Sequence, residues 1–181
     1  MKIRAGYEIS YDCPQPTPMI LTLSVHPSRF PDLLTRDAMK LEPSIPANTY
    51  HDSFGNFCHV IHAPAGRLTM SADFLIRDDG LPDEVPQQAQ QHELEDLPVE
   101  VLLYLLGSRY CETDRLTNIA WSLFGHVEKG WPLVQAICTY VHNHITFGYA
   151  FASPTKTAWD AWSEQRGVCR DFAHLAITLC R

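Results

Sequence analysis

Apolar and polar residues alternate along several short stretches of the first 77 residues. The clearest stretch is 67–76, where Leu68, Met70, Ala72, Phe74 and Ile76 occupy every second position. A period of two places such side chains on one face of a half-buried strand. We therefore expect strands at 3–11, 19–25, 58–62 and 67–76.

Turn-forming residues separate these strands. The segment 50–57 carries Asp52, Ser53, Gly55 and Asn56, whose side chains or conformational freedom suit a tight turn. Short strands connected in this way are typical of antiparallel sandwiches. We expect an α+β protein in which residues 1–77 form an N-terminal antiparallel β-sandwich domain.

A polar stretch follows at residues 78–97. It opens with Asp78, Asp79 and Gly80 and continues through the glutamine-rich segment 87–91. Such a composition is typical of an exposed linker or a long loop. We therefore expect a linker between the β-domain and the remaining residues, 98–181.

The apolar spacing becomes helical after Pro98. Pro132 suits a first helical turn, and apolar residues then recur at helical spacing as far as Ile145, with Gly148 ending the element. Thr157 and Asp160 have the spacing of a capping box. We expect the helix they begin to end at Arg166-Gly167, where Gly167 fits a left-handed cap.

A last helix is expected from Cys169 to the end of the chain. Phe172, Ala176, Ile177 and Leu179 are among the residues that give it a broad apolar surface. We expect this surface to pack against a core.

Composition narrows the classes of partner. The formal net charge is −7 and Lys and Arg are not clustered, which argues against nucleic acid and anionic membranes. The chain has no apolar run near the ~18 residues of a membrane span and no signal peptide at its start, so we expect a cytoplasmic protein. Its six cysteines contain no C-x-x-C pair, and we expect reduced thiols.

Cys169 is the residue with the strongest chemical signal. Gly167 permits a sharp turn before it, and Cys169 falls in the first turn of the last helix, where unpaired backbone N–H groups favour a thiolate. The same N–H groups can stabilise the oxyanion of an acyl-transfer reaction. The alternative from local chemistry is a buried structural cysteine, the commonest state of a free cysteine.

The segment 166–175, Arg-Gly-Val-Cys-Arg-Asp-Phe-Ala-His-Leu, resembles the nucleophile motif of bacterial transglutaminase-like cysteine proteases. The segments 50–56 and 144–149 also resemble stretches of that family, in the same order. The resemblance implies a papain-like transglutaminase core in which Cys169 is the catalytic nucleophile of a Cys-His-Asp triad.

The resemblance places the histidine and aspartate of the triad after the nucleophile helix. Neither can be assigned to a residue here, because the sequence ends at Arg181. We therefore expect residues 98–181 to be the helical part of a truncated core, and this chain by itself to be inactive. The position of the upstream oxyanion-hole residue is left open.

Asp171 and His174 are the remaining candidate residues near Cys169. Asp171 either pairs locally with Arg170, Arg166 or the helix N-terminus, or positions the missing histidine. His174 lies five residues after Cys169, a rotation of about 140° along a helix, so we expect it to have a packing role.

We interpret two groups of residues before Cys169, histidines and tryptophans, as having structural roles. His142 and His144 lie two apart on one helix, which does not suit a shared metal ion, and we assign no metal. Trp131, Trp159 and Trp162 are expected to pack in the core.

The resemblance thus implies a cysteine protease that acts on peptide or amide bonds and needs no metal or organic cofactor. Protein crosslinking by transglutaminase chemistry and a non-catalytic protein-binding module are the alternatives. We expect a peptide or protein substrate, no nucleic acid and no membrane partner. In this family the nucleophile helix packs against a sheet that the sequence up to Arg181 does not include, so Phe172, Ile177 and Leu179 are expected to be exposed. Such an apolar face predicts a homodimer or poor solubility.

Overall fold

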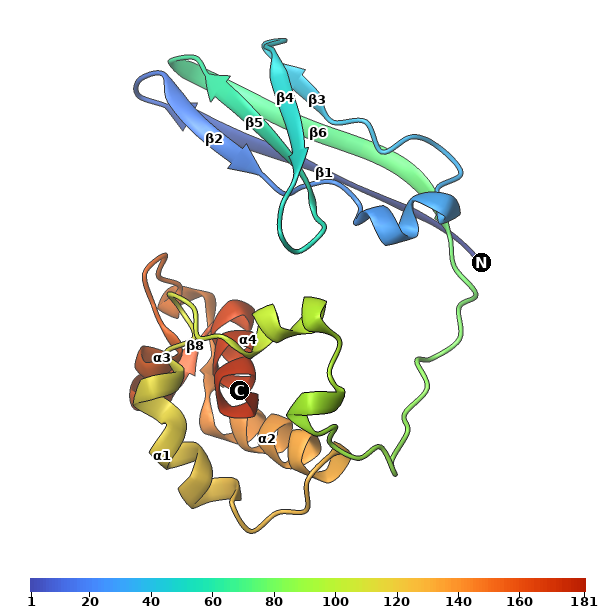
Figure 1. The fold of residues 1–181 in the computed structure, drawn as a ribbon. Helices are drawn as coiled ribbons and strands as arrows, with labels where there is room; N and C mark the ends of the chain where they lie inside the picture. Colours follow the sequence, from blue (N-terminus) through green and yellow to red (C-terminus); the bar gives the residue numbers. More distant parts are fainter. The chain divides into compact units, whose positions relative to one another are not determined.

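A computed structural model describes all 181 residues and divides them into two compact units, Met1–Asp83 and Glu84–Arg181. Figure 1 shows the strands of the first unit and the helices of the second. The protein therefore belongs to the predicted α+β class. None of its helices is long and apolar enough to cross a membrane.

The β-domain contains two three-stranded antiparallel sheets. One sheet has the order β1-β6-β3, from Lys2–Cys13, Gly66–Arg77 and Lys40–Glu42. The other has the order β2-β5-β4, from Thr17–Leu21, Phe57–Ala63 and Ala47–His51. The strand predicted at 19–25 thus begins two residues earlier and ends at Leu21.

Apolar residues at every second position of the strands form one core between the two sheets. Leu68 and Met70 of β6 pack in a single cluster with Ile61 and Ala63 of β5. Each of these four side chains is buried. The period-2 pattern of 67–76 therefore predicted the inward face of β6 correctly.

The two longest strands, β1 and β6, form the longest ladder. Their register runs from Lys2 opposite Arg77 to Cys13 opposite Gly66. The amino group of Met1 donates a hydrogen bond to the carbonyl of Asp78, so the ladder is closed at that end too.

The turn predicted at 50–57 is confirmed between β4 and β5. Asp52 makes it: its carboxylate accepts hydrogen bonds from the backbone N–H groups of Phe54 and Asn56, both at 2.9 Å. The expected turn chemistry of an aspartate is therefore observed.

The second unit is mainly helical. Its elements are the short 3-10 helices η2 Leu94–Asp96, η3 Val99–Leu105 and η4 Tyr149–Phe151, the helices α1 Thr113–Phe124, α2 Trp131–His144, α3 Ala158–Glu164 and α4 Cys169–Cys180, and the short parallel pair β7 Thr146–Phe147 and β8 Arg166–Gly167. Helix α1 was not predicted from the sequence.

Helix α4 packs against α1, α2 and α3, and it lies among them in Figure 1. Leu175 is fully buried in the core that these helices share, and Leu116, Ile137 and Ala158 surround it. The core of the helical unit is therefore organised around α4.

The apolar surface of α4 differs in part from the prediction. Leu175 and Leu179 are buried and Phe172 is half-buried, whereas Ile177 is 41% exposed. The expected exposure of Leu179 is wrong, because Leu179 packs in the helical core. The homodimer stays a prediction.

Candidate functional site

Cys169 is the first residue of α4. Val168 before it is extended, with φ −113° and ψ 177°, and the helix then continues to Cys180. Cys169 is exposed, in contrast to the buried Cys13, Cys58 and Cys111, and all six cysteines are free. The sequence therefore predicted the position of Cys169 correctly, and the alternative of a buried structural cysteine does not describe this residue.

Asp171 fixes the start of α4. Its side chain is fully buried, and one carboxylate oxygen accepts a hydrogen bond of 2.9 Å from the backbone N–H of Val168. The other oxygen lies 3.4 Å from the guanidinium of Arg170. These contacts match the structural reading of Asp171, and no histidine donates a hydrogen bond to it.

Gly167 is required by the position of Asp171 and not by a left-handed cap. A Cβ on Gly167 would lie 2.6 Å from Asp171 Oδ2 and 2.7 Å from Asp171 Cβ. The left-handed residue at the end of α3 is Gln165, with φ 54°. The prediction that Gly167 supplies the left-handed cap is therefore wrong.

The strand β8 holds the turn before Cys169 in place. It pairs in parallel with β7, and the N–H of Gly148 donates to the carbonyl of Gly167 at 3.0 Å. On the side toward α4, the rings of Phe147 and Phe172 lie 6.3 Å apart. Both the backbone and the side chains thus connect this turn to the end of α2.

Arg170, directly after Cys169, anchors the loop before α3. Its guanidinium donates hydrogen bonds to the carbonyls of Ser153, Pro154 and Lys156, those to Pro154 and Lys156 at 3.4 Å. A planar group with five N–H donors suits such a set of carbonyls. This role was missed from the sequence, because it depends on a loop 14–17 residues away.

Two backbone N–H groups at the start of α4 have no partner. The N–H of Val168 is used by Asp171, and the N–H groups of Asp171 and Phe172 donate to the carbonyl of Val168. Those of Cys169 and Arg170 donate to no group in the structure. They are therefore available to an oxygen bound beside the exposed thiol.

His174 lies farther along α4. Its ring stacks on Tyr110, with centroids 5.5 Å apart and planes 7° from parallel, and its Nδ1 is buried without a partner. Burial, and then the charge of Arg170, lower the pKa of His174, whereas Asp171 raises it. The expected packing role matches this environment.

The histidines of α2 are structural or exposed. His144 stacks between Tyr140 and Trp162, and its Nε2 lies 2.7 Å from the carbonyl of Trp162, to which it donates. His142 is exposed. No group of three or more His, Cys, Asp or Glu residues is arranged to hold a metal ion.

The tryptophans separate into two kinds. Trp159 and Trp162 pack against the helical core, 5.3 Å from each other, and Arg115 lies 4.2 Å above the Trp159 ring. Trp131 begins α2, and its N–H donates to the carbonyl of Ala89. Core packing therefore describes Trp159 and Trp162.

Chemically, the site combines an exposed thiol with two free N–H donors at the N-terminal end of α4. The partial positive charge of that end stabilises an anion there, whether a thiolate or the oxygen of a tetrahedral adduct. It contains no histidine hydrogen-bonded to Cys169, so these residues supply a nucleophile and an anion site without a paired base.

Comparison with known proteins points in the same direction. Residues 122–181 match the family model of the Transglutaminase-like superfamily. The fold is similar to a crystal structure of a putative cysteine protease from Cytophaga hutchinsonii, with a TM-score of 0.81 and 25% sequence identity. The match covers 99% of this chain and 65% of that one, so this chain spans less than two thirds of that protein. No curated protein matches.

Proposed function

We propose that Cys169 is the nucleophile of a cysteine protease that cleaves peptide or amide bonds. The match of residues 122–181 to the Transglutaminase-like superfamily and the similarity to the Cytophaga hutchinsonii structure support this proposal. The observation that carries this proposal is the exposed Cys169 thiol at the start of α4, with the N–H groups of Cys169 and Arg170 free. A nucleophile and an oxyanion site in one turn are what thiol acyl transfer requires.

The reaction begins with the Cys169 thiolate attacking the carbonyl carbon of the substrate. A carbon–sulfur bond forms and the carbonyl oxygen takes the negative charge, which the two free N–H groups stabilise. The oxyanion then re-forms the carbonyl, and the amine leaves with a proton from a general acid. Water attacks the resulting thioester, releases the acid and restores the thiol.

The general acid and base are the part of the reaction that residues 1–181 leave unassigned. None of the histidines hydrogen-bonds to Cys169, and His144 and His174 are held in packing contacts. We propose that the histidine and aspartate of the triad lie outside these residues, and that residues 1–181 alone do not turn over substrate. The greater length of the similar protein supports this.

The proposal favours hydrolysis over crosslinking. The similar solved structure is described as a putative cysteine protease, which supports water as the acceptor of the acyl group. Capture of the thioester by an amine would use the same nucleophile and the same oxyanion site, so Asp171, Gly167 and Cys169 have the same roles in both.

Alkylation of the thiols tests the nucleophile directly. Iodoacetamide reacts with the thiolate, so labelling near neutral pH measures how far each site favours it. Cys138 is the internal control, because it is also exposed but lies within α2 and away from a helix start. We expect Cys169 to be labelled at least about tenfold faster than Cys138, with the labelling of each cysteine measured by peptide mass spectrometry.

Equal labelling rates for Cys169 and Cys138 would contradict an activated nucleophile. The β-domain and helical unit would then be better described as a non-catalytic binding module. A Cys169→Ala variant, which removes only the thiol, identifies the fast-reacting site and should leave the labelling of Cys138 unchanged.

A further inference from the structure

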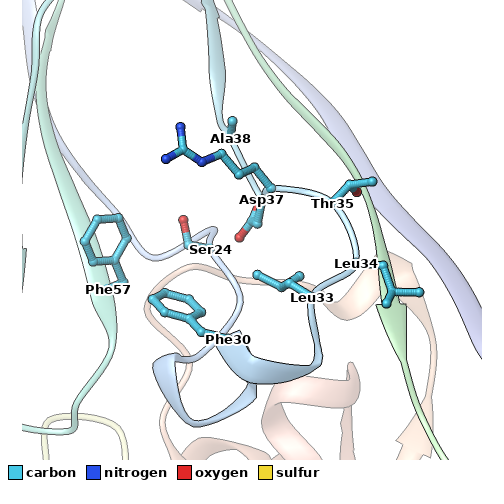
Figure 2. A pocket seen from close by; sticks show the side chains of 9 residues that line it. Ser24, Phe30, Leu33, Leu34, Thr35, Asp37, Ala38 and Phe57 are labelled. Carbon is cyan, nitrogen blue, oxygen red and sulfur yellow. The ribbon is translucent and has the colours of Figure 1, made fainter.

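A cavity lies in the β-domain, within residues that the proposed function does not use. Its volume is about 720 Å³, inside the range of about 300–1,000 Å³ typical of small-molecule sites. Figure 2 shows the side chains of Ser24, Phe30, Leu33, Asp37 and Phe57 around it. Both apolar and polar side chains line it.

Two aromatic rings form one wall of the cavity. Phe57 comes from β5, and Phe30 comes from the 3-10 helix η1, Pro27–Asp32, with their rings 6.2 Å apart and 75° from parallel. Such an edge-to-face pair presents a rigid aromatic surface. Phe30 is nevertheless 40% exposed, so this wall is open to a ligand.

Residues 33–35, which also line the cavity, are fixed to β6. The N–H of Leu34 donates to the carbonyl of Leu75 at 2.8 Å, and the N–H of Leu75 donates to Thr35 Oγ1 at 2.7 Å. Leu33 bridges to Ile76 in the same region. The segment that carries Arg36 and Asp37 is thus held by the sheet.

The two charged residues of the cavity differ in availability. Asp37 Oδ2 accepts a hydrogen bond of 2.6 Å from the N–H of Val25, and Asp37 Oδ1 is buried without a partner. Neither oxygen of this carboxylate is therefore well exposed to a ligand in the open cavity.

Arg36, in contrast, is exposed and forms no ion pair. Three other arginines of the β-domain are paired: Arg4 with Asp73, Arg29 with Asp32 and Asp78, and Arg67 with Asp12. The hydroxyl of Ser24 also has no hydrogen-bond partner, and Figure 2 shows it beside the space between Phe57 and Asp37. The available polar groups are thus one cation and one hydroxyl.

From this arrangement we propose that the β-domain binds a carboxylate carried on a short aromatic or branched apolar group. Arg36 pairs with the carboxylate, and the apolar body packs against Phe30, Phe57 and Leu33. Such a group is found at the C-terminus of a peptide that ends in an apolar residue, and in free aryl or alkyl acids. This site is independent of Cys169.

The experiment is a titration of the 181-residue chain followed by ¹H–¹⁵N NMR spectra. The probes are N-acetyl-L-phenylalanine, its uncharged amide, and 3-phenylpropionate. We expect saturable shifts confined to residues 24–38 and the neighbourhood of Phe57, with the acid binding more tightly than the amide. Tighter binding of the N-acetyl acid identifies a peptide end, and tighter binding of phenylpropionate identifies a free acid.

Arg36→Gln tests the ion pair. It should weaken binding of the acid by about fivefold, which corresponds to the upper end of the energy of an exposed ion pair. The affinity for the amide should not change. Arg77→Gln is the matched control, because Arg77 also forms no ion pair and does not line the cavity. Equal affinities for acid and amide, an equal effect of the two substitutions, or no saturation at millimolar concentration would overturn the proposal.

Discussion

The carboxylate of Asp171 occupies the space that a side chain on Gly167 would need. A Cβ at Gly167 would lie 2.6 Å from Asp171 Oδ2, and Asp171 itself is fully buried. The same carboxylate accepts the hydrogen bond of Val168, so the turn before Cys169 and the first turn of α4 are shaped by one side chain.

Gly167→Ala should therefore destabilise the helical unit. Forcing a methyl group against Asp171 costs about 1–3 kcal/mol, as overpacking in a tight core does. All four tryptophans, Trp121, Trp131, Trp159 and Trp162, lie in the helical unit, so urea unfolding followed by tryptophan fluorescence reports on this unit alone.

The exposed Ala173→Ser, on the same helix, is the control and should change the midpoint little. A Gly167→Ala protein with the unchanged midpoint would mean that the contact between positions 167 and 171 relaxes freely.

Asp171→Ala and Asp171→Asn separate the hydrogen bond from the charge. Alanine leaves the N–H of Val168 without its acceptor, at a cost of about 1–3 kcal/mol, whereas asparagine keeps an oxygen in nearly the same volume. We expect a clearly lower urea midpoint for alanine than for asparagine. Equal losses for the two would show that the charge, and with it the contact to Arg170, is the larger contribution.

Arg170→Lys should loosen the loop before α3. A lysine cannot reach the carbonyls of Ser153, Pro154 and Lys156 together, and we expect a loss of about 1–2 kcal/mol. Limited proteolysis should show faster cleavage in 152–157, with cleavage in the β-domain unchanged. An unaltered cleavage pattern would argue that Arg170 does not hold this loop.

The lowered pKa of His174 makes the helical unit sensitive to acid. Below about 6.5, the ordinary pKa of a histidine, the unfolded chain takes up a proton that the folded chain resists, so stability falls as the pH falls. Above that pH His174 is neutral in both the folded and the unfolded chain, so stability no longer depends on its titration. We expect the urea midpoint to decrease between pH 7 and pH 5, with a smaller decrease in His174→Phe.

Phenylalanine keeps a ring against Tyr110 and removes the titration. If the variant and the native chain lost stability in parallel on acidification, another group would be responsible.

Cys180 provides a contrast to the proposed nucleophile. Burial raises the pKa of its thiol, and the neighbouring Cys138 raises it further. Because the thiolate is the reactive form, Cys180 should be the slowest of the three exposed cysteines with iodoacetamide. Cys138→Ser should accelerate Cys180 slightly. Labelling of Cys180 as fast as that of Cys169 would be inconsistent with this environment.

Local signals predicted much of the fold. The turn at Asp52 and the start of α2 at Pro132 depend on residues close in sequence, and both were predicted correctly. The capping box of α3 is another case: Thr157 Oγ1 accepts from the N–H of Asp160, and the Asp160 carboxylate accepts from the N–H of Thr157. At Asp52 and in the capping box a side chain bonds to backbone within four residues, and at Pro132 the proline ring itself favours the first helical turn.

What the sequence did not predict depends on contacts between distant residues. Helix α1 buries Leu116 and Phe124 against other helices, and its first turn is polar, which hid its pattern. Gly167 is a different case: Asp171 is only four residues away, but the contact depends on the angle between β8 and the first turn of α4, which the sequence pattern does not give. The β-domain cavity depends on Phe57 meeting residues 24–38, including Phe30, which lie well before it in the sequence.

The long β1–β6 ladder determines how the β-domain yields under mechanical tension. Because Lys2 lies opposite Arg77, a pull between these two ends loads the pairs one after another and unzips the ribbon. A pull between Cys13 and Arg77 acts along the strands and shears all 12 pairs at once, so far greater force is needed. The β1–β6 pair therefore resists force weakly in one direction and strongly in the other.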